Sequence, residues 1–163
     1  MTGRSALPWL GLSTVVVVLD QWTKWIAIDS LQRYESVAVV PGLNWTLLYN
    51  FGAAFSFLNV PGGAQRWLFT GLAIVISLVL LVWLHRTDRS DWRTAAPLAL
   101  IVGGAIGNVI DRIRLGYVID FIDVYYKNWH WPAFNIADSA ITLAAVGLII
   151  YGFRQPEKDP TDP

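Results

Sequence analysis

Cysteine is absent from the 163-residue chain, and only two histidines are present. This excludes disulfides, thiolate nucleophiles and cysteine-based metal sites, and two well-separated histidines do not make a zinc site. Charged residues are also scarce, at 15% against roughly 25% in soluble domains. The formal net charge is zero, which gives no reason to expect a nucleic-acid partner.

Long apolar stretches take the place of charge, and 55% of the residues are hydrophobic. A helix of about 20 apolar residues crosses a bilayer, and four stretches approach that length. Several of the nine tryptophans stand where these stretches begin or end, as in the aromatic belts of membrane proteins. We therefore expect an α-helical integral membrane protein with four transmembrane helices. The predicted spans are residues 9–28, 67–84, 94–113 and 136–153.

Arginines between the second and third spans predict the orientation. Arg86, Arg89 and Arg93 crowd this short link, and positive charge in short loops marks the cytoplasmic side. Both termini are then cytoplasmic, and the longer links, 29–66 and 114–135, face outward. Residues 1–154 are expected to form a single membrane domain, followed by a polar tail, 155–163, that we expect to be disordered.

The outer links have patterns of their own. Val37–Val40 is rich in β-branched residues and precedes a Pro-Gly turn, and Leu43–Tyr49 mixes β formers with polar residues. The pattern predicts a small β-sheet on the membrane surface. Residues 53–58 are expected either to continue this sheet or to enter the membrane interface. In the second link, the aromatic segment from Tyr125 to Trp131 is expected in the headgroup layer.

Polar side chains gather near the outer ends of the first, third and fourth spans. A charge near the bilayer centre costs about 2.5 kcal/mol or more on insertion scales, so such residues are rarely without function. Their shared depth predicts one polar site near the outer face of the membrane. Its candidate members are Asp20, Lys24, Asn108, Asp111, Arg112, Asn135 and Asp138, with Asp120 in the link that follows the third span.

Some of these residues are expected to support the site. Asp20 and Lys24 are four positions apart, so they share a helix face and can neutralise each other. Arg112 either joins the site or extends to the headgroups. We expect Asp111 to be structural and Asp123, in a wet link, to be solvated.

Asp120 and Asp138 have apolar neighbours that a solvated carboxylate would not need. Two carboxylates in a shared, partly apolar site cannot both ionise cheaply, so the pair is expected to hold one proton near neutral pH. One member can then take a proton from water while the other protonates or polarises a scissile carbonyl. This is the aspartic-protease arrangement, and it needs no metal and no cofactor.

Two other classes of protein also place charges within a membrane. A small proton-coupled transporter should show polar residues spread through the depth, often with internal repeats. A non-catalytic scaffold should lose its carboxylates without consequence. The polar residues collect at one end, the second span is bare and no repeat is visible, so we favour the enzyme.

Five segments taken together resemble the lipoprotein signal peptidase family, also called signal peptidase II. Their order and spacing match the family from the first span into the fourth. The segments are Asp20–Lys24, Asn50–Ser56, Gly104–Arg112, Val118–Asp123 and Phe134–Ala140.

The resemblance implies a bacterial inner-membrane aspartic protease of four transmembrane helices, with a periplasmic β-cradle and a short periplasmic helix, here around Tyr125 to Trp131. Such an enzyme cuts prolipoproteins before the diacylglyceryl-modified cysteine, works among membrane lipids and is inhibited by the cyclic peptide globomycin. The family's catalytic dyad falls on Asp120 and Asp138. Its supporting positions fall on Asp20, Lys24, Asn50, Gly104, Asn108, Arg112 and Asn135.

Overall fold

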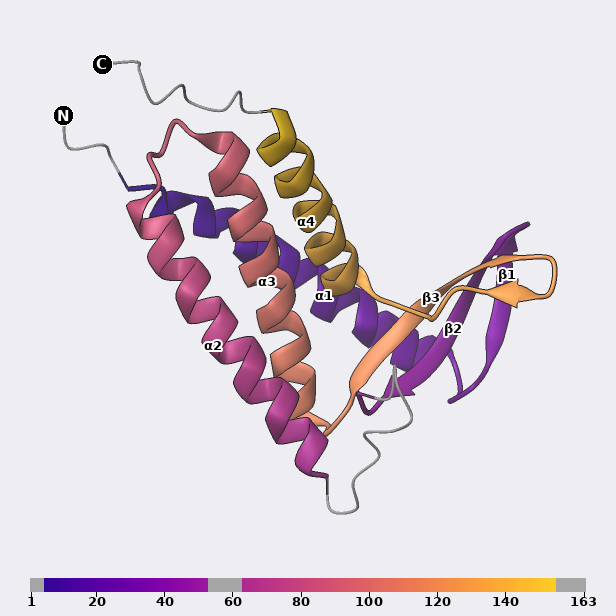
Figure 1. Cartoon of the computed structure of the whole chain (residues 1–163). Coiled ribbons are helices and arrows are strands. Elements are labelled where there is room, and N and C mark those ends of the chain that lie inside the picture. The colour runs from indigo at the N-terminus through magenta and orange to yellow at the C-terminus, as the bar shows by residue number, and fades with distance from the viewer. Residues whose placement is uncertain (1–4, 53–62, 155–163) are drawn as a thin grey trace, which may run out of the picture.

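The structure is a computed structural model that describes residues 5–52 and 63–154. Within these residues, a bundle of long helices stands beside a small antiparallel sheet (Figure 1). The helices are α1 (Leu10–Ser30), α2 (Ala64–Arg86), α3 (Trp92–Arg114) and α4 (Ile136–Arg154), with a 3-10 turn, η1 (Leu7–Trp9), before α1. Each long helix coincides with one of the predicted spans to within a few residues at either end. Residues 53–58 and the tail 155–163, both subjects of predictions, lie outside the described residues.

The apolar character of the helices fits an integral membrane protein. Among the described residues, α2 and α3 are long and apolar enough to cross a bilayer, and the apolar part of α4, Ile136–Gly152, is shorter. The 21 residues of α1 would extend about 31 Å, but they include Asp20, Lys24 and Asp29. Most large apolar side chains of α2 are exposed, as on a surface that faces lipid.

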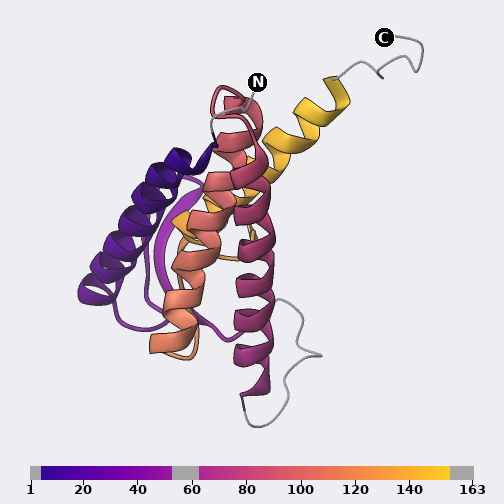
Figure 2. The same cartoon turned by 90° about the vertical axis from the view of Figure 1, so that its left-hand side faces the viewer.

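Helix α3 lies at the centre of the bundle and contacts the other three long helices. Figures 1 and 2 show it between α2 and α4 in one view and between α1 and α2 in the other. Small residues make this packing possible. A β-carbon at Gly104 would lie 2.5 Å from the Ala137 carbonyl oxygen, and one at Gly107 would lie 2.6 Å from an Asp20 carboxylate oxygen.

The sheet has the strand order β1-β2-β3-β4. Its strands are β1 (Ser36–Val40), β2 (Leu43–Asn50), β3 (Val118–Tyr126) and β4 (Trp129–His130). The two predicted β segments thus form β1 and β2. Buried apolar residues from α1, β2 and β3 pack the sheet against the bundle, namely Ala27, Leu47, Ile119 and Phe121.

The expected short helix from Tyr125 to Trp131 is wrong. These residues end β3, turn and form β4, with Tyr126 paired to Trp129 and Tyr125 paired to His130. Lys127 turns the chain at a φ of 54°. Aromatic side chains favour strands, and a two-residue loop joins antiparallel strands directly, so this sequence forms a hairpin.

Candidate active site

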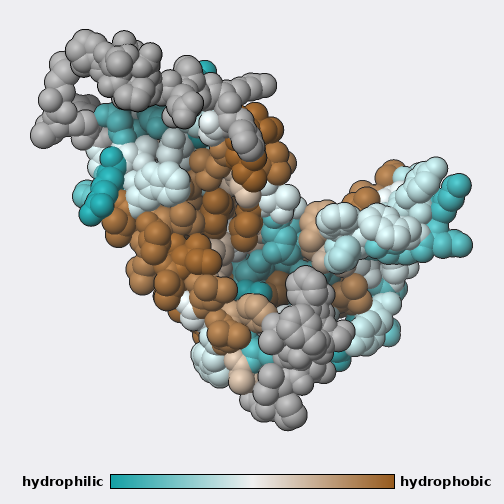
Figure 3. Space-filling model, in the orientation of Figure 1, coloured by the Kyte–Doolittle hydropathy of each residue, from teal (hydrophilic) through white to brown (hydrophobic). Residues whose placement is uncertain are grey.

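The candidate site lies where the sheet meets the bundle. Strand β3 presents Asp120, and the first turn of α4 presents Asp138. We call these two residues the acid pair. Figure 3 shows hydrophilic surface in the hollow between the apolar bundle and the sheet.

Asparagine side chains hold both members of the acid pair. Asn50 and Asn135 donate to the two oxygens of Asp120, at 2.9 and 2.8 Å. Asn108 donates to Asp138 at 2.7 Å. The sheet register brings Asn50 to this place, because Asn50 pairs with Val118 and Asp120 follows two residues later on the same face. These amide groups carry no charge. Within the described residues, neither Asp120 nor Asp138 has an ion-pair partner.

Burial changes the proton affinity of Asp120, which is only 2% exposed. Loss of hydration raises the pKa of its carboxyl group to about 7, and the negative charge of Asp138 adds to this effect. Hydrogen bonds from Asn50 and Asn135 oppose the rise. This direction supports the prediction that the acid pair shares a proton near neutral pH, which stays a prediction.

A second group of buried charged residues lies next to the acid pair. Lys24 Nζ lies 2.8 Å from carboxylate oxygens of both Asp20 and Asp111, and the side chains of all three residues are at most 4% exposed. We call these residues the lysine triad. Asp111 also accepts from the Ile119 backbone amide at 3.1 Å. The expected pairing of Asp20 with Lys24 is confirmed. The structural role of Asp111 stays a prediction, supported by its contacts with Lys24 and the Ile119 amide.

The lysine triad positions the Asn108 side chain and the first turn of α4. Lys24 donates to the Asn108 side-chain oxygen at 3.1 Å, so the Asn108 amide nitrogen faces Asp138. Asn135 caps α4, because its side-chain oxygen accepts from the Asp138 backbone amide at 2.9 Å. Asp20 accepts a hydrogen bond at 2.9 Å from the backbone amide of Ala137, which precedes Asp138 in the first turn of α4. The position of Asp138 therefore depends on α1 as well as on α4.

Two hollows open beside the acid pair. The helix groove, of about 300 Å³, lies between α2, α3 and α4, with Asp138 and Arg112 among mostly apolar side chains. The sheet groove, of about 290 Å³, is lined by Asp120 and Asn50 with Tyr34, Leu48, Tyr49, Phe51, Pro132 and Ala133. One aspartate thus borders each groove. The predicted Arg112 lines the helix groove, and Gly104 serves helix packing.

Sequence reasoning missed two sets of polar contacts. Gln21 donates to Asp111 at 2.8 Å and to the Gly107 carbonyl at 3.2 Å; its polarity within an apolar span was the available signal. Asp123 is not solvated as expected, since it is 9% exposed and accepts from Asn44 at 2.8 Å. His130 lies 2.9 Å from the same carboxylate, and nothing local in the sequence predicted this contact.

Apolar helices and a small antiparallel sheet, with a buried polar site between them, are the features of an integral membrane protein. Two solved bacterial membrane enzyme structures, determined by the in meso method at 2.3 and 1.9 Å resolution, have this fold. They align with TM-scores of 0.84 and 0.83, at 30% identity, over 100% and 96% of this chain and 99% of each matched chain.

The chain belongs to the signal peptidase (SPase) II family, whose model matches residues 12–154. It is similar to the lipoprotein signal peptidase of Acinetobacter baylyi, at 56% identity over 90% of this chain and 82% of that protein. It is also similar to the enzyme of the same description from Xanthomonas campestris pv. campestris, at 56% identity over 91% and 89% of the two chains. The family resemblance expected from the motifs is confirmed, and the transporter alternative is not supported.

Proposed function

We propose that this chain removes signal peptides from diacylglyceryl-modified prolipoproteins by aspartate-catalysed hydrolysis. The observation that carries the mechanism is the acid pair: Asp120 and Asp138 are held by amides and have no cationic partner in the described residues. Family membership and the names of the relatives support the substrate.

The two aspartates have different roles in the proposed reaction. Asp120 carries the shared proton, because burial and the neighbouring charge raise its pKa to about 7. Asp138 is then the base, with its anion stabilised by the Asn108 amide and by the N-terminus of α4.

The proposed reaction conserves atoms and charge. Asp138 accepts a proton from water as the water oxygen attacks the scissile carbonyl carbon, and Asp120 donates its proton to the carbonyl oxygen. The tetrahedral intermediate then collapses as Asp138 returns a proton to the leaving amine and Asp120 recovers the one that it gave. Each carboxyl group ends in its starting state, and the reaction needs no metal or other cofactor.

The two grooves suggest how the substrate lies. We infer that the apolar helix groove takes the lipid-embedded side of the substrate, because its wall is continuous with the apolar surface of the bundle. The sheet groove, which contains polar and aromatic side chains, takes polypeptide on the other side of the scissile bond. Globomycin-type inhibitors would occupy the same space and compete with the substrate.

The proposed setting is a bacterial inner membrane crossed by all four long helices. The arginines between α2 and α3 support a cytoplasmic location for that link and for both termini. The sheet and the acid pair lie at the other end of the bundle, which is then the periplasmic face (Figure 1).

A cleavage assay tests this proposal. The purified protein in phospholipid vesicles would be incubated with a prolipoprotein, with and without the diacylglyceryl group, and the released peptide identified by mass spectrometry. We expect cleavage of the lipidated substrate alone, unaffected by EDTA and blocked by globomycin. Peptidase function is excluded if the wild type releases no peptide.

Substitutions within the same assay test the catalytic roles. Asp120→Asn and Asp138→Asn should each lower the rate by about 10²- to 10⁴-fold, the usual contribution of a general acid or base. Asp29→Asn is the matched control, because Asp29 is an exposed carboxylate on α1 that does not belong to the acid pair. The assignment is wrong if either aspartate of the acid pair can be replaced at no cost in rate.

A further inference from the structure

The opposite end of the bundle holds a second polar feature, which the proposed function does not use. A pocket of about 420 Å³ opens between the N-terminal part of α3 and the C-terminal part of α4, within the usual size range of ligand sites. Its lining residues are Trp92, Arg93, Pro97, Gly147, Ile150 and Tyr151.

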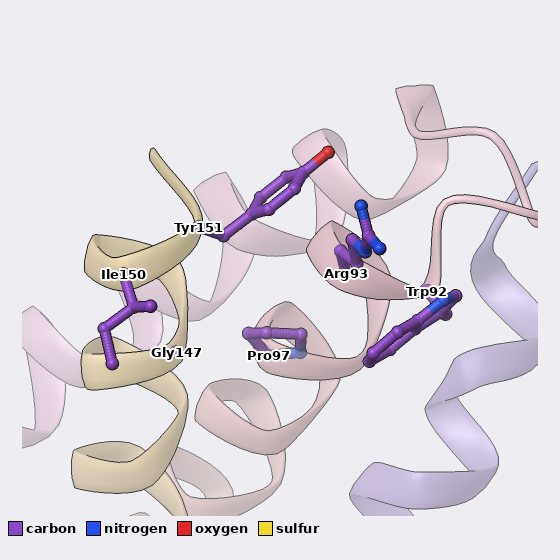
Figure 4. A pocket seen from close by; sticks show the side chains of 6 residues that line it. All are labelled: Trp92, Arg93, Pro97, Gly147, Ile150 and Tyr151. Carbon is purple, nitrogen blue, oxygen red and sulfur yellow. The ribbon is translucent and has the colours of Figure 1, made fainter. Parts of the chain in front are cut away.

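Aromatic rings flank the cationic group at this pocket. The Arg93 guanidinium carbon lies 5.7 Å from the ring centre of Trp92 and also 5.7 Å from that of Tyr151. Figure 4 shows Arg93 between these two side chains, with Pro97 below it. Arg93 is exposed, and a guanidinium group that stacks on aromatic rings presents N–H donors that match the geometry of phosphate oxygens.

The lower part of the pocket is apolar and open. Gly147 leaves a gap on α4, since a β-carbon there would meet no atom within 4 Å. Pro97 and Ile150 line the pocket with it. Pro97 also has no amide hydrogen, so it cannot donate to the Arg93 carbonyl four residues earlier.

The surrounding charges favour an anion. The acidic residues of the α2–α3 link bind groups of the link itself: Asp88 accepts from Ser90, and Asp91 caps α3 by accepting from the Thr94 amide at 3.2 Å. Arg86 and Arg89 belong to the same segment of chain. This end of the bundle is thus basic where α3 and α4 leave the apolar layer.

We propose that this pocket binds an anionic phospholipid, with the phosphate on Arg93, the headgroup between Trp92 and Tyr151, and an acyl chain along Gly147 and Ile150. Basic pockets between transmembrane helices at the membrane surface recognise such headgroups, and tryptophan and tyrosine are enriched at that level. The proposal does not depend on the peptidase reaction, because the site lies at the other end of the bundle.

Native mass spectrometry of the full chain in detergent, with phosphatidylglycerol or phosphatidylcholine added, tests the proposal. The wild type should retain phosphatidylglycerol about five-fold better, as expected for one arginine–headgroup contact. Arg93→Gln should abolish this preference, and Gly147→Leu, which fills the gap, should reduce retention of the lipid. Arg86→Gln and Gly152→Leu are matched controls outside the pocket and should behave as wild type.

Three results would overturn the proposal. The first is equal retention of the two lipids by the wild type. The second is an Arg93→Gln variant that keeps the preference, or an Arg86→Gln variant that loses it equally. The third is displacement of bound lipid by inorganic phosphate, which would reveal a site for small anions. Cleavage activity measured in phosphatidylcholine should be unchanged in Arg93→Gln, which shows that the variant is folded.

Discussion

The lysine triad and the acid pair are both groups of buried carboxylates, and they differ in what holds them. In the triad, one ammonium group forms ion pairs at 2.8 Å with both Asp20 and Asp111. In the pair, neutral amides of Asn50, Asn108 and Asn135 hold the carboxylates.

We propose that this difference separates a structural role from a reactive one. The ammonium group of Lys24 contacts both carboxylates of the triad directly and fixes their positions. Amides position a carboxylate without supplying charge, so burial still raises the proton affinity of Asp120. The two groups meet at Asn108, whose oxygen accepts from Lys24 and whose nitrogen donates to Asp138.

The largest expected effect on stability comes from removing the lysine. Lys24→Met should lower the stability of the fold by about 3–5 kcal/mol, because two buried carboxylates lose their partner. Thermal unfolding in detergent measures the change. Lys127→Met, at the exposed turn of the β3–β4 hairpin, is the control. An unchanged unfolding midpoint for Lys24→Met would show that the triad is not structural.

A packing substitution should move one acid while the other stays in place. Gly104→Ala places a methyl group against the Ala137 carbonyl, so α4 and Asp138 must shift away from α3. We expect a loss of about 1–3 kcal/mol in stability and up to about 10²-fold in rate. Gly71→Ala is the control, because a β-carbon there meets no atom within 4 Å. A fully active Gly104→Ala enzyme would contradict the proposed geometry.

The pH profile tests the amide side of the comparison. Activity should fall as the pH rises through about 7, where Asp120 loses the shared proton. Asn50 stabilises the ionised form, so Asn50→Ala should raise the pKa of Asp120 and move the alkaline limb up by about one unit.

Asn44→Ala is the control for this measurement, because the amide of Asn44 binds Asp123 instead. Its alkaline limb should match that of the wild type. A limb that stays in place, or moves to lower pH, in Asn50→Ala would show that Asp120 does not carry the proton lost there.

The smallest expected effect concerns Asp123, a carboxylate outside both groups. Its partner His130 has a side chain that is 51% exposed, so solvent screens the contact. His130→Gln should therefore change stability by less than about 1 kcal/mol and leave the cleavage rate unchanged. A large loss of activity would mean that this contact belongs to the catalytic machinery.

Local patterns in the sequence predicted the helices and the first two strands. Apolar runs marked the helices, and β-branched residues before a Pro-Gly turn marked β1. The motifs also indicated Asp120, Asp138 and the asparagines around them. The short helix that the family resemblance implied from Tyr125 to Trp131 is wrong, because a two-residue turn makes this segment a hairpin. The location of its aromatic side chains in the headgroup layer stays a prediction.

Other contacts were beyond local reasoning because they join distant segments. Gln21 reaches Asp111 across 90 positions, and Asn44 reaches Asp123 across 79. The register of β2 against β3 decides that Asp123 is covered, and no pattern around Asp123 reveals that register. The residues of the candidate site were therefore predicted from the sequence, whereas the hydrogen bonds that connect them could be found only from the fold.

The acid pair is split between two layers, since Asp120 belongs to the sheet and Asp138 to a helix. Asn135 joins them by donating to one carboxylate and accepting from the backbone of the other residue. During biogenesis, a chain whose helices have inserted but whose sheet has not docked would contain both aspartates without the pair. Proteolytic competence would then be the last property acquired in assembly, and an incompletely folded copy would be harmless to the proteins around it.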